Sequence, residues 1–105
     1  MEAKDIFFHD CVLLRVVERV DQDTLALEVE YPVEWESNTF APKTIVFHDV
    51  LRYHVDEMPF SGPSTILEYA TEPDGERTRI TLRSNAGQRA FSFSRVELID
   101  GHAAR

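Results

Sequence analysis

Cysteine and glycine are scarce in this sequence of 105 residues, which contains one cysteine and four glycines. A lone cysteine cannot form an internal disulfide, so the chain is not a disulfide-stapled secreted scaffold. Phosphate loops of the GxGxxG and GxxxxGK(S/T) types are missing, and no serine lies in a GxSxG motif. No apolar run approaches the length of about 18 residues that a transmembrane helix needs. These absences leave a small domain without a recognisable catalytic motif.

Basic residues are also few, with 11 Lys and Arg against 19 Asp and Glu and a formal net charge of −8. Nonspecific nucleic-acid binding needs a net basic surface, so this balance argues against it. An acidic surface does attract basic proteins. The first ten residues do not form a secretory signal, and together with the free cysteine they favour a cytoplasmic location without membrane association.

Apolar and polar residues alternate in several segments, which is the pattern of strands with one buried face. Residues 24–31 place three aliphatic side chains and a tyrosine on one face, and residues 77–84 alternate in the same way. Short turn sequences separate such segments at intervals of about a dozen residues. The pattern predicts a single all-β domain over residues 1–105: an antiparallel meander of six or seven strands closing into a roll, barrel or sandwich.

Several segments are less regular. The apolar side chains of residues 12–20 fit either a strand or a helical stripe, and the many valines and the missing capping box favour a strand. Residues 32–42 and 58–63 are predicted to be long loops, where binding residues usually lie. The alternation shifts its phase near Ser94, which predicts a β-bulge. The lone Cys11 is expected to be a buried packing residue.

Two pentapeptides are nearly identical: IFFHD at residues 6–10 and IVFHD at residues 45–49. The favoured interpretation is structural, with Phe8 and Phe47 pointing into the core and each His–Asp pair bonded to backbone groups at a bend. Histidine with carboxylate is also a ligand set for zinc, although adjacent residues of a strand point to opposite faces. The metal alternative would use His9, Asp10, His48, Asp49 and His54. No metal or other cofactor is predicted.

The only tryptophan is flanked by acidic residues. Glu34, Trp35, Glu36 and Phe40 are the predicted partner-binding residues. Rigid aromatic anchors surrounded by charges are typical of protein interfaces, where the charges steer the partner. The alternative is that Trp35 folds back over an open end of the barrel and belongs to the core.

The tripeptide Phe8-His9-Asp10 precedes a predicted strand pair, a second aromatic strand and a closing hairpin. This order resembles small bacterial β domains of unknown function, and the similarity spans residues 6–99. Some of these families are interpreted as immunity proteins encoded beside polymorphic toxins. The resemblance implies no catalytic residues, because these families have none assigned.

We therefore expect a noncatalytic binding or interaction module, most specifically an immunity-type inhibitor of a basic partner protein. The alternative is a small-ligand or metal-binding β-barrel whose mouth is lined by Trp35, Tyr53, Phe91 and Phe93. If the acidic strand at residues 24–31 and the arginine-rich strand at residues 77–84 are neighbours, they can pair across the sheet. If they are not neighbours, the molecule has an acidic and a basic face, which would allow head-to-tail association or a twofold homodimer.

Overall fold

Strands account for almost all of the regular structure in the computed structural model, which describes residues 1–34 and 36–102. One short 3-10 turn, η1 (Ala3–Asp5), precedes eight strands. The strands are β1 (Val12–Arg19), β2 (Thr24–Glu34), β3 (Thr39–His48), β4 (Leu51–Glu57), β5 (Ser64–Asp74), β6 (Arg77–Ser84), β7 (Gly87–Phe93) and β8 (Arg95–Asp100). The predicted all-β antiparallel architecture is confirmed, with eight strands instead of six or seven. The described residues include no helix long and apolar enough to cross a membrane.

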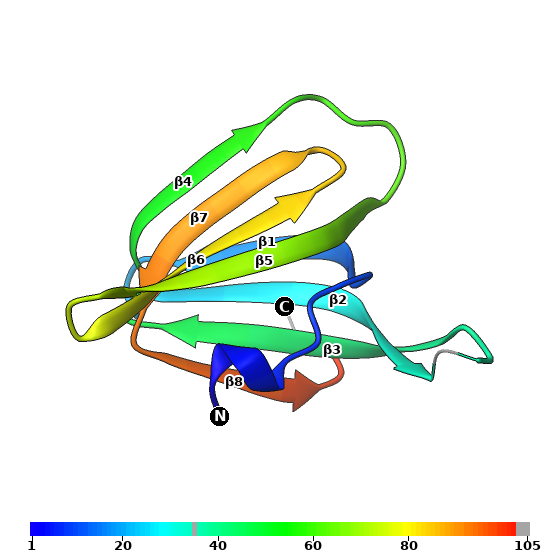
Figure 1. Cartoon of the computed structure of the whole chain (residues 1–105), viewed down its shortest axis with the longest axis horizontal. Coiled ribbons are helices and arrows are strands. Elements are labelled where there is room, and N and C mark those ends of the chain that lie inside the picture. Colours follow the sequence, from blue (N-terminus) through cyan, green and yellow to red (C-terminus); the bar gives the residue numbers. More distant parts are fainter. Residues whose placement is uncertain (35, 103–105) are drawn as a thin grey trace.

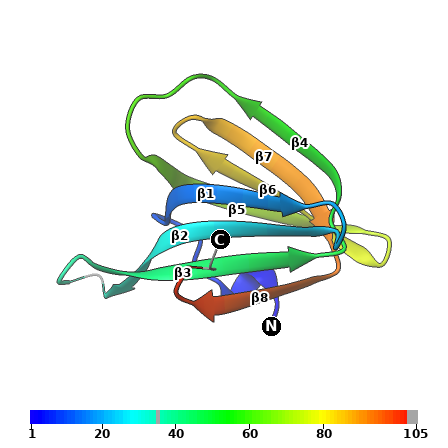
Figure 2. The ribbon, with the colours of Figure 1, turned by 180° about the vertical axis from the view of Figure 1, so that it is seen from behind.

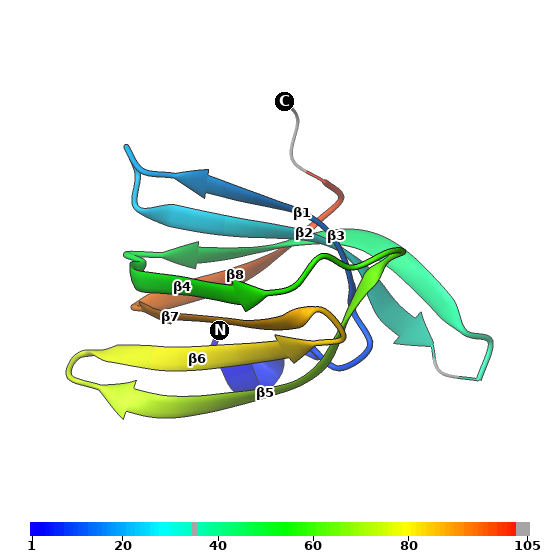
Figure 3. The same cartoon turned by 90° about the horizontal axis from the view of Figure 1, so that it is seen from above.

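The strands form one open sheet in the order β4-β7-β6-β5-β1-β2-β3-β8. This sheet folds back on itself into two facing layers, as Figures 1 and 3 show. One layer contains β1, β2, β3 and β8, and the other contains β4, β7, β6 and β5. Among the described residues, hydrogen-bonded strand pairing links the two layers only where Val12 and Leu13 of β1 pair with Thr65 and Ser64 of β5. Beyond this junction β1 and β5 diverge, so of the predicted closures the sandwich is the one observed (Figure 3).

The additional strands arise because two segments cross from one layer to the other. β3 passes into β4 at residues 49–50, and β7 passes into β8 at Ser94. The Ser94 amide donates to the carbonyl of His48 at 3.0 Å, and its hydroxyl donates to the Asp49 carboxylate. Asp49 adopts a φ of +58°, a left-handed conformation that aspartate tolerates at sharp turns. The prediction of a β-bulge near Ser94 is therefore wrong, because the chain crosses from one layer to the other there.

The layer of β4 to β7 has Greek-key order. β5, β6 and β7 follow one another as hairpins, and β4 lies beside β7. Residues 58–63 run across the end of this layer from β4 to β5, and the amide of Met58 donates to the Ala86 carbonyl at 3.0 Å. The segment 58–63 is thus tied to the β6–β7 turn.

Residues 12–20 were compatible with either a strand or a helix. They form β1 and pair with β2, so the strand interpretation is confirmed and the helical one is wrong. The register with β2 shifts between Leu13 and Arg15. Arg15 donates to the carboxylate of Glu28 on β2 at 2.9 Å, which leaves the Glu28 side chain only 7% exposed. At this irregularity Leu14 has no partner residue on β2 and remains 52% exposed.

Aromatic side chains fill the space between the two layers. Phe8 and Phe47 are fully buried, which confirms the inward orientation predicted from the two pentapeptides. The ring of Phe47 lies edge-on to those of Phe91 and Phe93, with centroids 4.7 and 4.9 Å away. Since Phe91 and Phe93 are buried in this cluster, they do not line an open mouth, and the interior ligand site expected there is not formed by the described residues.

Candidate binding groove

The two layers leave one side of the sandwich open between β1 and β4. β1 pairs with β5 only through Val12 and Leu13, and β4 pairs only with β7. The rest of the outer edge of each strand has no neighbouring strand among the described residues. Unpaired backbone groups at a strand edge are a template for pairing with another chain. This side of the molecule therefore presents two such edges facing a common space.

A groove of about 660 Å³ occupies this space. Four large apolar side chains along it remain well exposed: Leu14 (52%), Val55 (49%), Met58 (77%) and Phe60 (46%). They come from β1, from β4 and from the segment 58–63. Single exposed apolar residues are ordinary, whereas several around one hollow are typical of an interaction surface.

A fixed ion pair forms the polar part of the groove. The guanidinium of Arg89 on β7 donates to both carboxylate oxygens of Glu57 on β4 at 2.8 Å, and to the hydroxyl of Tyr53 at 2.6 Å. The hydrogen bond with Glu57 is the main cause that raises the pKa of Arg89 above its ordinary value. Arg89 and Glu57 are only 21% and 19% exposed. A bidentate pair of this kind holds its geometry and specifies orientation more than affinity.

Ser64 lies where β1 and β5 begin to diverge. Its hydroxyl oxygen is buried, lines the groove and has no hydrogen-bond partner among the described residues. A buried hydroxyl without a partner costs stability of about 1–3 kcal/mol. A backbone amide or carbonyl of a segment bound in the groove would give the Ser64 hydroxyl a hydrogen-bond partner.

The predicted partner-binding residues lie on a different feature, the β2–β3 hairpin. This hairpin projects beyond the body of the sandwich in every view (Figures 1 to 3). Glu34 and Glu36 are exposed, and Phe40 is half-buried opposite Pro32. Trp35 lies outside the described residues. The prediction of a long loop over residues 32–42 is wrong, because β2 and β3 pair almost to the tip of the hairpin.

The two His–Asp pairs lie at separate bends. Nδ1 of His9 donates to the Leu67 carbonyl of β5 at 2.5 Å, and Asp10 has a φ of +70°. Nε2 of His48 donates to the Glu97 carboxylate of β8 at 2.6 Å. The contact of His9 is with a backbone group, as the structural interpretation predicted, whereas His48 and Asp49 bond to side chains.

The metal alternative requires His54 to share the face of His48, which holds only if one unbroken strand contains both residues; that condition is not met. The chain changes layer at Asp49, so His48 lies on β3 and His54 on β4. Over residues 1–34 and 36–102, no three His, Cys, Asp or Glu side chains come together as a metal site.

Cys11 is a packing residue in the structure. It is fully buried, and its thiol donates to the Phe7 carbonyl at 3.2 Å. Burial, with a smaller contribution from Asp10, raises the pKa of the Cys11 thiol to about 12. The thiolate, which is the reactive form, is therefore not populated near neutral pH.

Sequence reasoning named Tyr53 as lining a mouth but missed the exposed apolar residues of the groove. Leu14 follows Leu13 and so breaks the alternation of β1, and Met58 and Phe60 are apolar residues in a segment predicted as loop. These two irregularities were the available signals. Nothing in the sequence indicated that β1 and β4, separated by 31 residues between Arg19 and Leu51, border the same hollow.

The fold and this groove define a small antiparallel β-sandwich that is open along one side. No family model matches the chain, and no curated protein matches it. An uncharacterized protein from Neisseria gonorrhoeae has a similar structure, with a TM-score of 0.63 and 15% sequence identity over 88% of this chain and 92% of that chain. At this identity the likeness shows a shared fold.

Proposed function

We propose that this protein is a noncatalytic interaction module that binds an extended segment of a partner protein in the groove between β1 and β4. The observation that carries the proposal is the combination of two unpaired strand edges with four exposed apolar side chains around one hollow. An extended segment added to a sheet edge gains main-chain hydrogen bonds, and side-chain pockets give it specificity.

The apolar contribution to binding can be estimated from exposure. Fully burying a Val, Leu, Met or Phe side chain stabilises a complex by roughly 1.5–3 kcal/mol. The groove side chains are about half exposed, so each contributes about 1 kcal/mol on binding, and the four together about 4 kcal/mol. This amount corresponds to roughly a thousandfold in affinity.

Charge favours a basic partner. The chain carries a net charge of −8, and the exposed Glu18 on β1 lines the groove without an ion-pair partner among the described residues. Glu34 and Glu36 add acidic charge on the projecting hairpin. Acidic surfaces raise the association rate of basic proteins, most strongly at low salt. An immunity-type inhibitor of a basic protein is the most specific form of this proposal.

Selection from a random peptide library displayed on phage tests the proposal. Selected peptides should be extended, with alternating apolar residues and flanking basic residues. Their binding should shift the backbone amide NMR signals of β1 and β4. Val55→Lys should weaken binding at least about tenfold, since a charge would be buried against the apolar segment.

Ile99→Lys on β8 is the matched control, because Ile99 is 44% exposed and lies outside the groove. Equal loss of binding in both variants, or shifts confined to other strands, would contradict the proposed site. A second copy of this chain is the competing occupant. Sedimentation would then show a dimer that Val55→Lys dissociates.

A further inference from the structure

Three arginines differ from the others in having no close carboxylate. Eight of the arginines lie in the described residues, and five of these donate to a carboxylate: Arg15, Arg19, Arg52, Arg83 and Arg89. Arg77 and Arg79 make no such bond within the described residues, and Arg95 reaches Glu97 only at 3.9 Å. In a chain with 19 acidic residues, arginines that donate no hydrogen bond to a carboxylate are candidates for binding an external anion.

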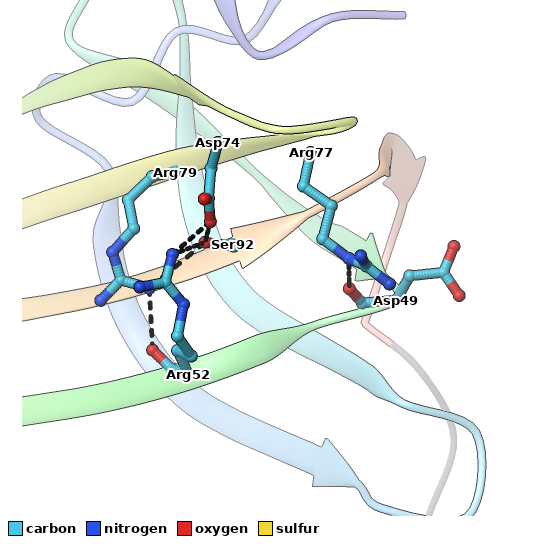
Figure 4. Close-up of polar contacts among 6 residues, drawn as sticks. All are labelled: Asp49, Arg52, Asp74, Arg77, Arg79 and Ser92. Atoms are coloured by element: carbon cyan, nitrogen blue, oxygen red, sulfur yellow. Dashed lines mark hydrogen bonds and ion pairs between the residues drawn. The ribbon is translucent and has the colours of Figure 1, made fainter.

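The guanidinium of Arg79 forms hydrogen bonds within the protein. Its guanidinium donates to the Arg52 carbonyl at 2.9 Å and to the Ser92 hydroxyl at 3.3 Å. Ser92 in turn donates to the Asp74 carboxylate at 2.5 Å, and Arg52 pairs with the same carboxylate (Figure 4). This network crosses β5, β6, β7 and β4 on the outer face of their layer, and its two arginines share the Asp74 carboxylate and the Ser92 hydroxyl.

Arg77 and Arg95 face a separate hollow of about 420 Å³. It lies between the N-terminal segment, the β5–β6 hairpin and the β7–β8 crossing. Its walls include the cations Lys4, Arg77 and Arg95, the acids Glu2 and Glu72, and the apolar residues Pro73, Phe93 and Val96. The walls thus carry three positive and two negative side chains, and Lys4 lies 3.9 Å from the Glu2 carboxylate.

Arg77 is held in place without being neutralised. Its Nε donates to the Asp49 carbonyl at 3.1 Å, and Figure 4 shows the side chain reaching the β3–β4 crossing, away from Arg52 and Arg79. The Asp49 carboxylate is bonded to the Ser94 hydroxyl. Both terminal nitrogens of Arg77 are thus left without a partner among the described residues.

We propose that this hollow binds the phosphoryl group of a small molecule, with Arg77 and Arg95 as its principal donors and Lys4 as a further positive charge. The planar fork of a guanidinium matches phosphate oxygens and donates two parallel hydrogen bonds. Anchoring through Nε orients this fork before the ligand arrives, which reduces the entropy lost on binding. The volume falls within the range of roughly 300–1,000 Å³ that small-molecule sites occupy, and the exposed Pro73 offers an apolar surface to an organic group.

NMR titration of the full chain with inorganic phosphate, phenyl phosphate and acetate, at matched ionic strength, tests the proposal. Both phosphates should saturate shifts of the Arg77 and Arg95 Nε–H signals, and acetate should bind at least about tenfold more weakly because it carries one charge. Tighter binding of phenyl phosphate would identify an organic phosphate as the ligand, and equal binding would identify inorganic phosphate.

Arg77→Gln and Arg95→Gln should each weaken phosphate binding about tenfold, as expected for the loss of a charge-assisted hydrogen bond. Arg83→Gln is the control, because Arg83 pairs with Glu68 and does not line the hollow. Arg95 is 65% exposed, so its variant tests the site even if Arg77→Gln disturbs the crossing. Shifts that do not saturate, or equal weakening in Arg83→Gln, would overturn the proposal. Val55→Lys in the groove should leave phosphate binding unchanged, which separates this site from the proposed partner site.

Discussion

Replacing Gly87 by alanine tests how closely β7 approaches β4. Gly87 begins β7, pairs with Glu57 and has a φ of +146°, a conformation that residues with a side chain rarely adopt. A Cβ atom at this position would lie 2.2 Å from the backbone oxygen of Asp56 and 2.8 Å from Cα of Glu57. Both contacts are with backbone, so the strand itself would have to move.

The expected loss of stability has two sources. Forcing a residue with a side chain into such a conformation costs about 1–3 kcal/mol. Overpacking against a fixed neighbour costs about 1–3 kcal/mol more. We therefore expect Gly87→Ala to lower the free energy of unfolding by about 4 kcal/mol, which is a fall in Tm of roughly 16–30 °C for a domain of this size.

Gly75→Ala is the matched control. Gly75 has a φ of +63°, but no atom lies within 4 Å of its Cβ position. The change should cost only the left-handed conformation, about 1 kcal/mol. Urea unfolding followed by circular dichroism measures both variants. If Gly87→Ala costs no more than Gly75→Ala, the close approach of β4 and β7 is refuted, and with it the position of β4 at the groove.

Three further outcomes are expected. Phe47→Ala should lower the free energy of unfolding by about 3–5 kcal/mol in urea titrations, because Phe47 is fully buried in the aromatic cluster. At pH 8 the Cys11 thiol, with a pKa of about 12, should react with a thiol reagent only after unfolding; rapid reaction of the native protein would contradict its burial. Hydrogen bonds from Ser92 and then Arg52 lower the pKa of Asp74 below 3.8, so its stabilisation is present at neutral pH and lost as the pH falls below that value. Asp74→Asn should therefore weaken the acid dependence of urea unfolding, and an unchanged dependence would refute this role.

Local patterns predicted the strands well. The alternation in residues 24–31 and 77–84 correctly assigned the buried faces of β2 and β6, with Leu25, Leu27 and Ile80 inside. These predictions succeeded because side-chain direction in a strand depends only on the parity of the residue number. Phe47 on β3 follows the same rule, whereas Phe8 is buried although it precedes β1 and lies in no strand.

The wrong predictions concern segments whose conformation is determined by contacts with residues far away in the sequence. The change of layer at Ser94 looked like a bulge, because both events shift the alternation by one residue. Residues 32–42 contain prolines that suggested a loop, yet Pro32 continues β2 opposite Phe40. His48 and His54 would share a face only in an unbroken strand, and the crossing at Asp49 places them on β3 and β4.

The amino-acid order alone indicated the class of fold and the buried faces of the strands, since both depend on neighbours a few positions away. The burial of Cys11, which raises the pKa of its thiol, was expected from residue type but was decided by tertiary packing. The groove and the phosphoryl-binding hollow depended on the folding of the sheet into two layers. That folding brings β1 beside β4, and Lys4 beside Arg77 and Arg95. These contacts depend on the register of strands far apart in the chain and on the β3–β4 and β7–β8 crossings. The local alternation of apolar and polar residues does not encode them.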